Sequence, residues 1–172
     1  RVRAALPGGR APAVVRDPFS AARLSAAGVL PPIGVVPDTG LLVDRLFPKR
    51  PADGTVVVQG CDLVVPFVDR IASSVLRTGL PPVLVETGRC RGDGLFADAM
   101  QAALRAGGVE PRRLPPTASL ADIASTLAGA DLVLASSLHA GITALAHGRR
   151  FVVLNLGDES KLRGFGAVAG CA

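Results

Sequence analysis

The chain has 172 residues, of which 49% are hydrophobic and 3% aromatic, and it carries a formal net charge of +5. This length predicts one ordinary domain over residues 1–172. The scarcity of aromatic side chains argues against a base-stacking platform, and the scattered basic residues form no nucleic-acid tail, so we expect no nucleic-acid partner. The positive charge suits anionic small molecules or a membrane surface, and equally a solvated arginine-rich surface.

The cysteines and the apolar runs indicate the cellular compartment. The three cysteines, at positions 61, 90 and 171, lie far apart and lack the spacing of a disulfide framework or a zinc site. No apolar run reaches the ~18 residues that span a bilayer, and the N-terminus lacks a signal-peptide layout. We therefore expect a cytoplasmic protein without a transmembrane segment. Because the chain begins at Arg1 rather than Met, we also expect that an upstream part is absent.

Short apolar runs rich in β-branched residues alternate with helical patterns along the chain. The runs predict strands over residues 13–15, 33–36, 55–59, 82–86, 131–135 and 151–155. Helices are predicted over 17–28, 66–79, 92–108 and 119–130, with a further apolar helix beginning at SSLH. The alternation predicts an α/β fold: a three-layer α/β/α, Rossmann-like domain with a mostly parallel sheet of about six strands.

Ligands of such folds bind beyond the carboxyl ends of the strands, so we expect the site to lie in the loops after the predicted strands. These loops are polar. Arg16 follows the first strand, Asp38 the second and Asp62 the third, while the fourth leads into TGRCRGDG. The glycine amides of that loop, together with Arg91, are suited to cradle a phosphate, although an ordinary surface loop explains them equally well.

The fifth predicted strand runs into Ser136, Ser137, Leu138 and His139. At a strand-to-helix turn, the serine hydroxyls and the free amides of the first helical turn can hold a phosphate or a carboxylate. Histidine adds a residue type that exchanges protons near neutral pH. A structural interpretation competes, in which Ser136 caps the helix and His139 packs in the core, and the tetrapeptide alone favours it. His147, at the far end of this helix, is interpreted as a partner of the helix C-terminus.

Four blocks of the sequence together resemble a known family. They are VVRDPFSAARLSAAGV, VVPDTGLLVDRLF, VETGRCRGDGLFADAMQAAL and ADLVLASSLHAGITALAHGRRFVVLNLGDESKLRGF. In this order, from about Val14 to Phe165, they resemble the C-terminal half of the polysaccharide pyruvyl transferase family. The resemblance implies one Rossmann-like half of a GT-B-like enzyme, so this chain would lack an N-terminal half that faces it across a cleft.

The resemblance also implies a reaction. A pyruvyl group passes from phosphoenolpyruvate to two hydroxyls of a sugar, which gives a cyclic ketal and free phosphate in exopolysaccharide or cell-wall glycan biosynthesis. The implied partners are phosphoenolpyruvate as donor and a saccharide or lipid-linked oligosaccharide as acceptor, and the implied location is cytoplasmic or peripheral at the inner membrane face. No cofactor and no metal is expected, because no cluster of His, Cys and carboxylates indicates one.

Individual residues take roles from the resemblance. His139 matches the family's histidine and becomes the candidate general acid or base. Arg16 matches the arginine of the RD block and Lys161 the late lysine. With the helix start at Ser136 and Ser137, these two cations suit the phosphate and carboxylate of phosphoenolpyruvate. Many members carry an arginine where this chain has Ser137. Further substrate-binding candidates are Asp38 and Arg91, and both Asp38 and Asp62 are candidates for holding sugar hydroxyls.

Two other functions remain open at this point. A nucleotide-sugar glycosyltransferase of GT-B type would use the same kind of domain to bind a diphosphate, and Asp158 or Glu159 would then contact the donor's ribose. A non-catalytic ligand-binding or assembly module is the third alternative, since half of the implied cleft is missing.

Overall fold

The larger sheet consists of five parallel strands in the spatial order β5-β4-β3-β6-β7. Its central strands are runs of valine and leucine that are buried on both faces, which is the pattern of a parallel sheet between helices. The strands are β3 (Val56–Gln59), β4 (Pro82–Leu84), β5 (Arg112–Arg113), β6 (Leu132–Ala135) and β7 (Arg150–Val153).

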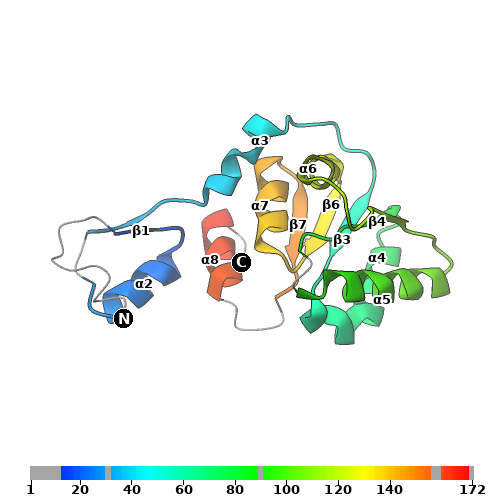
Figure 1. The fold of residues 1–172 in the computed structure, drawn as a ribbon, viewed down its shortest axis with the longest axis horizontal. Helices are drawn as coiled ribbons and strands as arrows, with labels where there is room; N and C mark the ends of the chain where they lie inside the picture. Colours follow the sequence, from blue (N-terminus) through cyan, green and yellow to red (C-terminus); the bar gives the residue numbers. More distant parts are fainter. Residues whose placement is uncertain (1–12, 30–31, 89–90, 156–159, 171–172) are drawn as a thin grey trace. The chain divides into compact units, whose positions relative to one another are not determined.

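Helices cover both faces of this sheet (Figure 1). Val56 and Val58 point to a core formed with η2 (Asp62–Phe67), α4 (Val68–Leu76) and α5 (Asp93–Ala106). Val57 points the other way, to a core formed with α6 (Leu120–Gly129) and α7 (Leu138–Ala146). This alternation along one strand separates the two cores. Preceding the sheet are η1 (Thr39–Leu42) and α3 (Val43–Leu46), and α3 packs against α7.

A second, smaller sheet pairs β1 (Ala13–Val15) in parallel with β2 (Ile33–Val35). The computed structural model describes residues 13–29, 32–88, 91–155 and 160–170. It divides the chain into two compact units, Arg1–Thr39 with Gly157–Ala172, and Gly40–Leu156. The first unit contains the small sheet, α2 (Pro18–Ala26) and α8 (Ser160–Ala169), and α2 packs against α8.

Side-chain caps explain where two of the helices begin. Asp17 accepts hydrogen bonds from the N–H and hydroxyl of Ser20 (2.7 and 2.8 Å) and caps α2. Ser119 and Asp122 form a capping box at the start of α6. Hydrogen bonds from Ser119 lower the pKa of the Asp122 carboxyl. Both starts agree with the predicted helices.

The structure confirms the mostly parallel α/β fold but corrects the strand count. The prediction placed about six strands in one sheet, whereas the first two pair with each other in the small sheet and the larger sheet gains β5. β5 and α8 were not predicted, because one is a pair of arginines and the other follows no apolar periodicity that we recognised. That residues 1–172 form a single domain stays a prediction. None of the helices in the described residues is both long and apolar enough to span a bilayer.

Gly60, directly after β3, is required by the packing of α5. A Cβ atom at this position would lie 2.6 Å from ring carbons of Phe96, which is 1% exposed. We predict that Gly60→Ala lowers the free energy of unfolding by about 1–3 kcal/mol, the usual cost of overpacking a core. Gly88→Ala is the control, since a Cβ there meets nothing within 4 Å. Equal stability of the two variants in urea denaturation would contradict this account.

Candidate functional site

The order of the strands locates the candidate site. From β3 the chain proceeds through β4 to β5 at one edge of the sheet, and then returns to place β6 and β7 on the other side of β3. Ligands of open α/β sheets bind where the strand order reverses in this way, outside the carboxyl ends of the strands. Here that point lies between β3 and β6, where Gln59 pairs with Ala135 and the chain enters Ser136 and Ser137.

The buried side chain of Gln59 connects the turn before α7 to the start of α5. Its side-chain amide is 2% exposed, with Oε1 accepting a hydrogen bond from the N–H of Ser137 (2.8 Å) and Nε2 donating to Oδ2 of Asp93 (2.9 Å). The backbone carbonyl of Gln59 also accepts from the N–H of Ser136 (3.2 Å). The residue thus fixes the turn between β6 and α7 against the end of β3.

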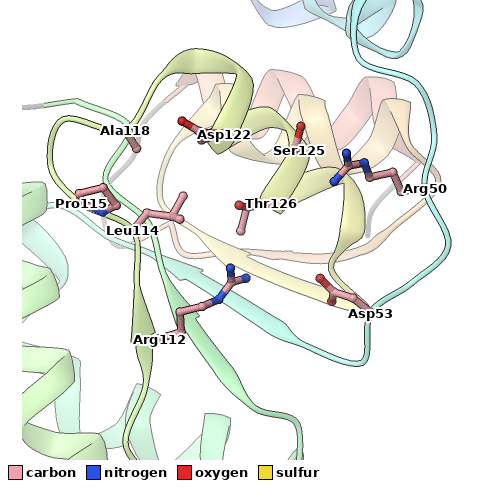
Figure 2. Close-up of a pocket in the computed structure, with 9 residues that line it drawn as sticks. All are labelled: Arg50, Asp53, Arg112, Leu114, Pro115, Ala118, Asp122, Ser125 and Thr126. Atoms are coloured by element: carbon pink, nitrogen blue, oxygen red, sulfur yellow. The ribbon is translucent and has the colours of Figure 1, made fainter.

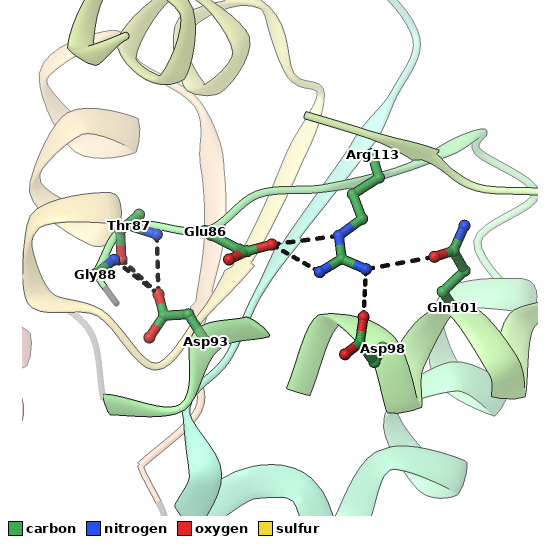
Figure 3. Close-up of polar contacts among 7 residues, drawn as sticks. All are labelled: Glu86, Thr87, Gly88, Asp93, Asp98, Gln101 and Arg113. Carbon is green, nitrogen blue, oxygen red and sulfur yellow. Dashed lines mark hydrogen bonds and ion pairs between the residues drawn. The ribbon is translucent and has the colours of Figure 1, made fainter. Parts of the chain in front are cut away.

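Asp93, the first residue of α5, organises the neighbouring loop (Figure 3). Its Oδ2 accepts from the N–H of Thr87 (2.9 Å), the hydroxyl of Thr87 (3.2 Å) and the N–H of Gly88 (3.0 Å), in addition to Gln59. The side chain is 3% exposed, and a carboxylate in the first turn also suits the helix dipole. Four donors on one oxygen hold the loop after β4 in place.

The first turn of α7 contains backbone N–H groups that the helix itself does not pair. Ser137 is the N-cap residue, yet its side chain makes no capping hydrogen bond. The first intrahelical bond of α7 runs from the N–H of Gly141 to the carbonyl of Ser137 (3.2 Å), so the amides of Leu138, His139 and Ala140 have no partner within the helix. Ser136 and Ser137 are half-buried. This arrangement can bind an anion through amides and hydroxyls together.

The two histidines of α7 occupy opposite environments. His139 is exposed beside the free amides, so the interpretation of it as a core histidine is wrong. His147 is 4% exposed, with Nδ1 2.8 Å from the carbonyl of Thr143 and Nε2 2.7 Å from that of Phe47. The contact with Thr143, in the last turn of α7, agrees with the role predicted at the helix C-terminus. Of the two, His139 is therefore the one accessible to a substrate.

Arg113 of β5 forms ion pairs with two carboxylates near the loop after β4 (Figure 3). Its Nη2 and Nε donate to Oε1 of Glu86 (2.7 and 3.3 Å), and its Nη1 lies 2.5 Å from Oδ1 of Asp98. Hydrogen bonds to Glu86, and then to Asp98, raise the pKa of the guanidinium. Because Glu86 follows β4 and Asp98 belongs to α5, this one side chain ties β5 to both.

Other predicted site residues lie elsewhere in the chain. Arg16, 42% exposed, approaches Asp38 in the first unit (Nη1 to Oδ2, 3.5 Å). Lys161 lies in α8 of the same unit, and its side chain falls outside the described residues. Whether it converges with Arg16 and His139 on one pocket stays a prediction. In the second unit, Arg91 and Asp62 are exposed. Asp158 and Glu159 are outside the described residues.

Gln59 and Asp93 were missed by the sequence analysis. Gln59 ends an otherwise uninterrupted valine run, and a polar residue at the last position of a buried strand is a usable signal. Asp93 follows a glycine in a polar loop, which is also the pattern of an ordinary surface turn.

Comparison with known proteins finds a family model that matches part of the chain. Residues 112–158 match the family model described as Polysaccharide pyruvyl transferase. This match confirms the resemblance over a segment that includes the turn between β6 and α7, and the family is one of transferases. No curated protein matches the chain.

Among the solved structures that are similar to this chain is a mutant of the O-GlcNAc transferase of Thermobaculum terrenum. The identity is 25% and the TM-score 0.46, over 70% of this chain and 25% of that chain. The present chain thus spans about a quarter of the length of that structure.

The buried carboxylate of Asp93 is expected to hold the site together. We predict that Asp93→Ala lowers the free energy of unfolding by about 2–4 kcal/mol, because it leaves buried donors of Gln59 and the Thr87 loop unpaired. Asp98→Ala, on the same helix, is the control: its side chain is 70% exposed, so about 1 kcal/mol or less is expected. Thermal and urea denaturation measure both. A cost for Asp93→Ala no larger than for Asp98→Ala would refute the assignment.

Proposed function

We propose that this chain is the C-terminal half of a polysaccharide pyruvyl transferase and that the start of α7 binds the anionic donor, phosphoenolpyruvate. The observation that carries this proposal is the turn at the sheet's reversal point, where three helix amides and two serine hydroxyls stand beside an exposed histidine. The family match over residues 112–158 supports it.

The chemistry of the transfer suits these groups. One sugar hydroxyl adds to C2 of phosphoenolpyruvate and loses its proton, while the enol methylene gains a proton and becomes a methyl group. A second hydroxyl then displaces phosphate from C2, which yields a cyclic ketal and inorganic phosphate. The amides of α7 stabilise the phosphate or the carboxylate, and they need no reorganisation as charge moves. His139 is the proposed acid or base for one of the proton transfers.

Arg16 and Lys161 are proposed to complete the donor site with fixed positive charge. Arginine matches the planar carboxylate in a bidentate manner, and a lysine ammonium neutralises phosphate as a point charge. Two carboxylates lie near Arg16: Oδ2 of Asp38 is 3.5 Å from Nη1 and Oδ2 of Asp17 is 3.9 Å from Nε, and both distances are long for a close ion pair. Asp38 is proposed to accept a hydrogen bond from a sugar hydroxyl.

The first unit is proposed to be completed by a further α/β segment, the N-terminal half of the enzyme. Parallel strands occur almost only where both faces are covered, and a two-stranded sheet is marginal by itself. In β1 and β2, however, Val14 is 59% and Val35 44% exposed, and Val36 directly after β2 is 53% exposed. These valines are the surface on which additional strands and helices would pack.

Replacing each of the two histidines by Gln in a separate variant distinguishes a catalytic role from a stabilising one. We predict that His139→Gln lowers turnover by about 10²–10⁴ with little change in melting temperature, as expected for a positioned acid or base. His147→Gln should do the reverse: it loses about 1–3 kcal/mol of stability, because a buried ring with two backbone contacts is replaced, while activity per folded molecule is kept. The enzyme that includes the N-terminal half is assayed by phosphate release from phosphoenolpyruvate with a saccharide acceptor.

In the same assay, Arg16→Gln should raise the KM for phosphoenolpyruvate more than it lowers turnover, since it removes donor binding rather than proton transfer. A destabilised His139→Gln variant with normal specific activity would remove His139 from the mechanism.

Amide hydrogen exchange tests the proposed completion of the first unit. In the present chain the amides of β1 and β2 should exchange quickly, whereas those of β3 and β6 are protected by the larger sheet. In a longer chain with the N-terminal half, protection of β1 and β2 should rise by at least about 10-fold, and that of β3 should not change. Unchanged exchange in β1 and β2 would mean that the added residues do not cover these strands.

A further inference from the structure

A cavity of about 440 Å³ lies along α6, apart from the start of α7 (Figure 2). Its polar lining comes from three parts of the second unit: Arg50 and Asp53 before β3, Arg112 of β5, and Asp122, Ser125 and Thr126 of α6. A volume of this size lies within the range of small-molecule sites. None of the roles proposed above uses these side chains.

The direction of Arg112 follows from the register of the sheet. Arg112 pairs with Val83 and Arg113 with Leu84, and these two partners point to opposite faces. Arg113 is held on the α5 face by Glu86 and Asp98. Arg112 must therefore point to the α6 face, and Figure 2 shows its guanidinium directed toward Thr126.

The opposite wall of the cavity is fixed to the C-terminal end of α6. The N–H of Asp53 donates to the carbonyl of Gly129 (2.8 Å), and Oδ1 of Asp53 accepts from the hydroxyl of Thr55 (2.6 Å). Arg149 donates to the carbonyl of Ala128 through Nε (2.7 Å) and to the carbonyl of Arg50 through Nη2. These contacts place the backbone of the Arg50 to Asp53 segment before any ligand arrives, which reduces the ordering cost of binding.

The charges of the lining select the kind of ligand. Within the described residues, neither the guanidinium of Arg50 nor that of Arg112 forms an ion pair, and both belong to exposed residues. Asp53 and Asp122 offset the two positive charges, so a ligand with several negative charges is disfavoured. The guanidinium groups of Arg50 and Arg112 can donate charge-assisted hydrogen bonds to one carboxylate. The hydroxyls of Ser125 and Thr126 and the aspartate oxygens can form hydrogen bonds with hydroxyl groups of a ligand.

We propose that this cavity is a binding site for a sugar acid, a polyhydroxylated ligand that carries a single carboxylate. The carboxylate lies between Arg50 and Arg112, and the hydroxyls contact the α6 wall at Ser125 and Thr126. The site is independent of pyruvyl transfer, because it uses none of the residues assigned to the donor. It would hold its ligand whichever reaction the chain supports.

The test is a titration of the isotope-labelled chain with D-glucuronate, followed by amide NMR shifts. Two controls carry one half of the ligand each: acetate has only the carboxylate, and D-glucose has only the hydroxyls. Glucuronate should shift the amides of Arg112, Ser125 and Thr126, and should bind at least about 10-fold more tightly than either control. Equal binding of acetate and glucuronate, or no shift along α6, overturns the proposal.

Variants assign the binding to the two arginines. Arg112→Gln and Arg50→Gln should each weaken glucuronate binding by about 10-fold or more, since each removes a charge-assisted hydrogen-bond donor. The matched control is Arg77→Gln, an exposed arginine at the end of α4 on the other face of the sheet, which should bind as the parent does. Unaltered affinity in both cavity variants, with folding verified by their NMR spectra, rules the site out.

Discussion

Oδ2 of Asp93 accepts four hydrogen bonds where the start of α5 meets the end of β3 and the loop after β4, and the rest of the candidate site depends on it. Gln59 is held by this oxygen through Nε2 and in turn holds the N–H of Ser137 through Oε1. A buried amide of this kind is costly unless both of its ends are paired, so the network is stable only as a whole. The consequence for function is that the start of α7 has a fixed position.

The same sheet uses the two-residue repeat of its strands to build two different surfaces. On β5, adjacent arginines point to opposite faces. Arg113 meets Glu86 and Asp98 and becomes part of the framework, whereas Arg112 lines a cavity. Identical residue types thus differ in role because Glu86 and Asp98 lie on one face of the sheet, within reach of Arg113 only. Arg113 forms ion pairs with two carboxylates, whereas Arg112 forms none within the described residues.

The strands of the larger sheet were predictable because a parallel strand buried on both faces needs a continuous run of β-branched residues, as in Val56 to Val58. The two-residue edge strand of arginines has no such run, and the separate pairing of β1 with β2 depends on long-range contacts that no local pattern encodes. The turn at SSLH was located correctly by its residues. The hydrogen bonds that hold this turn were not predicted, because Gln59 and Ser137 are 78 residues apart and Gln59 and Asp93 are 34 apart.

The two ends of α7 show why the exposed histidine is the functional candidate. His139 lies in the first turn of α7, and His147 is its C-cap residue. At the C-terminal end, the ring of His147 faces carbonyl oxygens from α7 and from Phe47, and both nitrogens are committed to the structure. At the N-terminal end, His139 lies in solvent next to amides that the helix itself cannot satisfy. A proton donor or acceptor must be able to reach a substrate, and an anion needs unpaired donors. Only the N-terminal end of α7 offers both within one turn, which is why the histidine there carries the proposed chemistry.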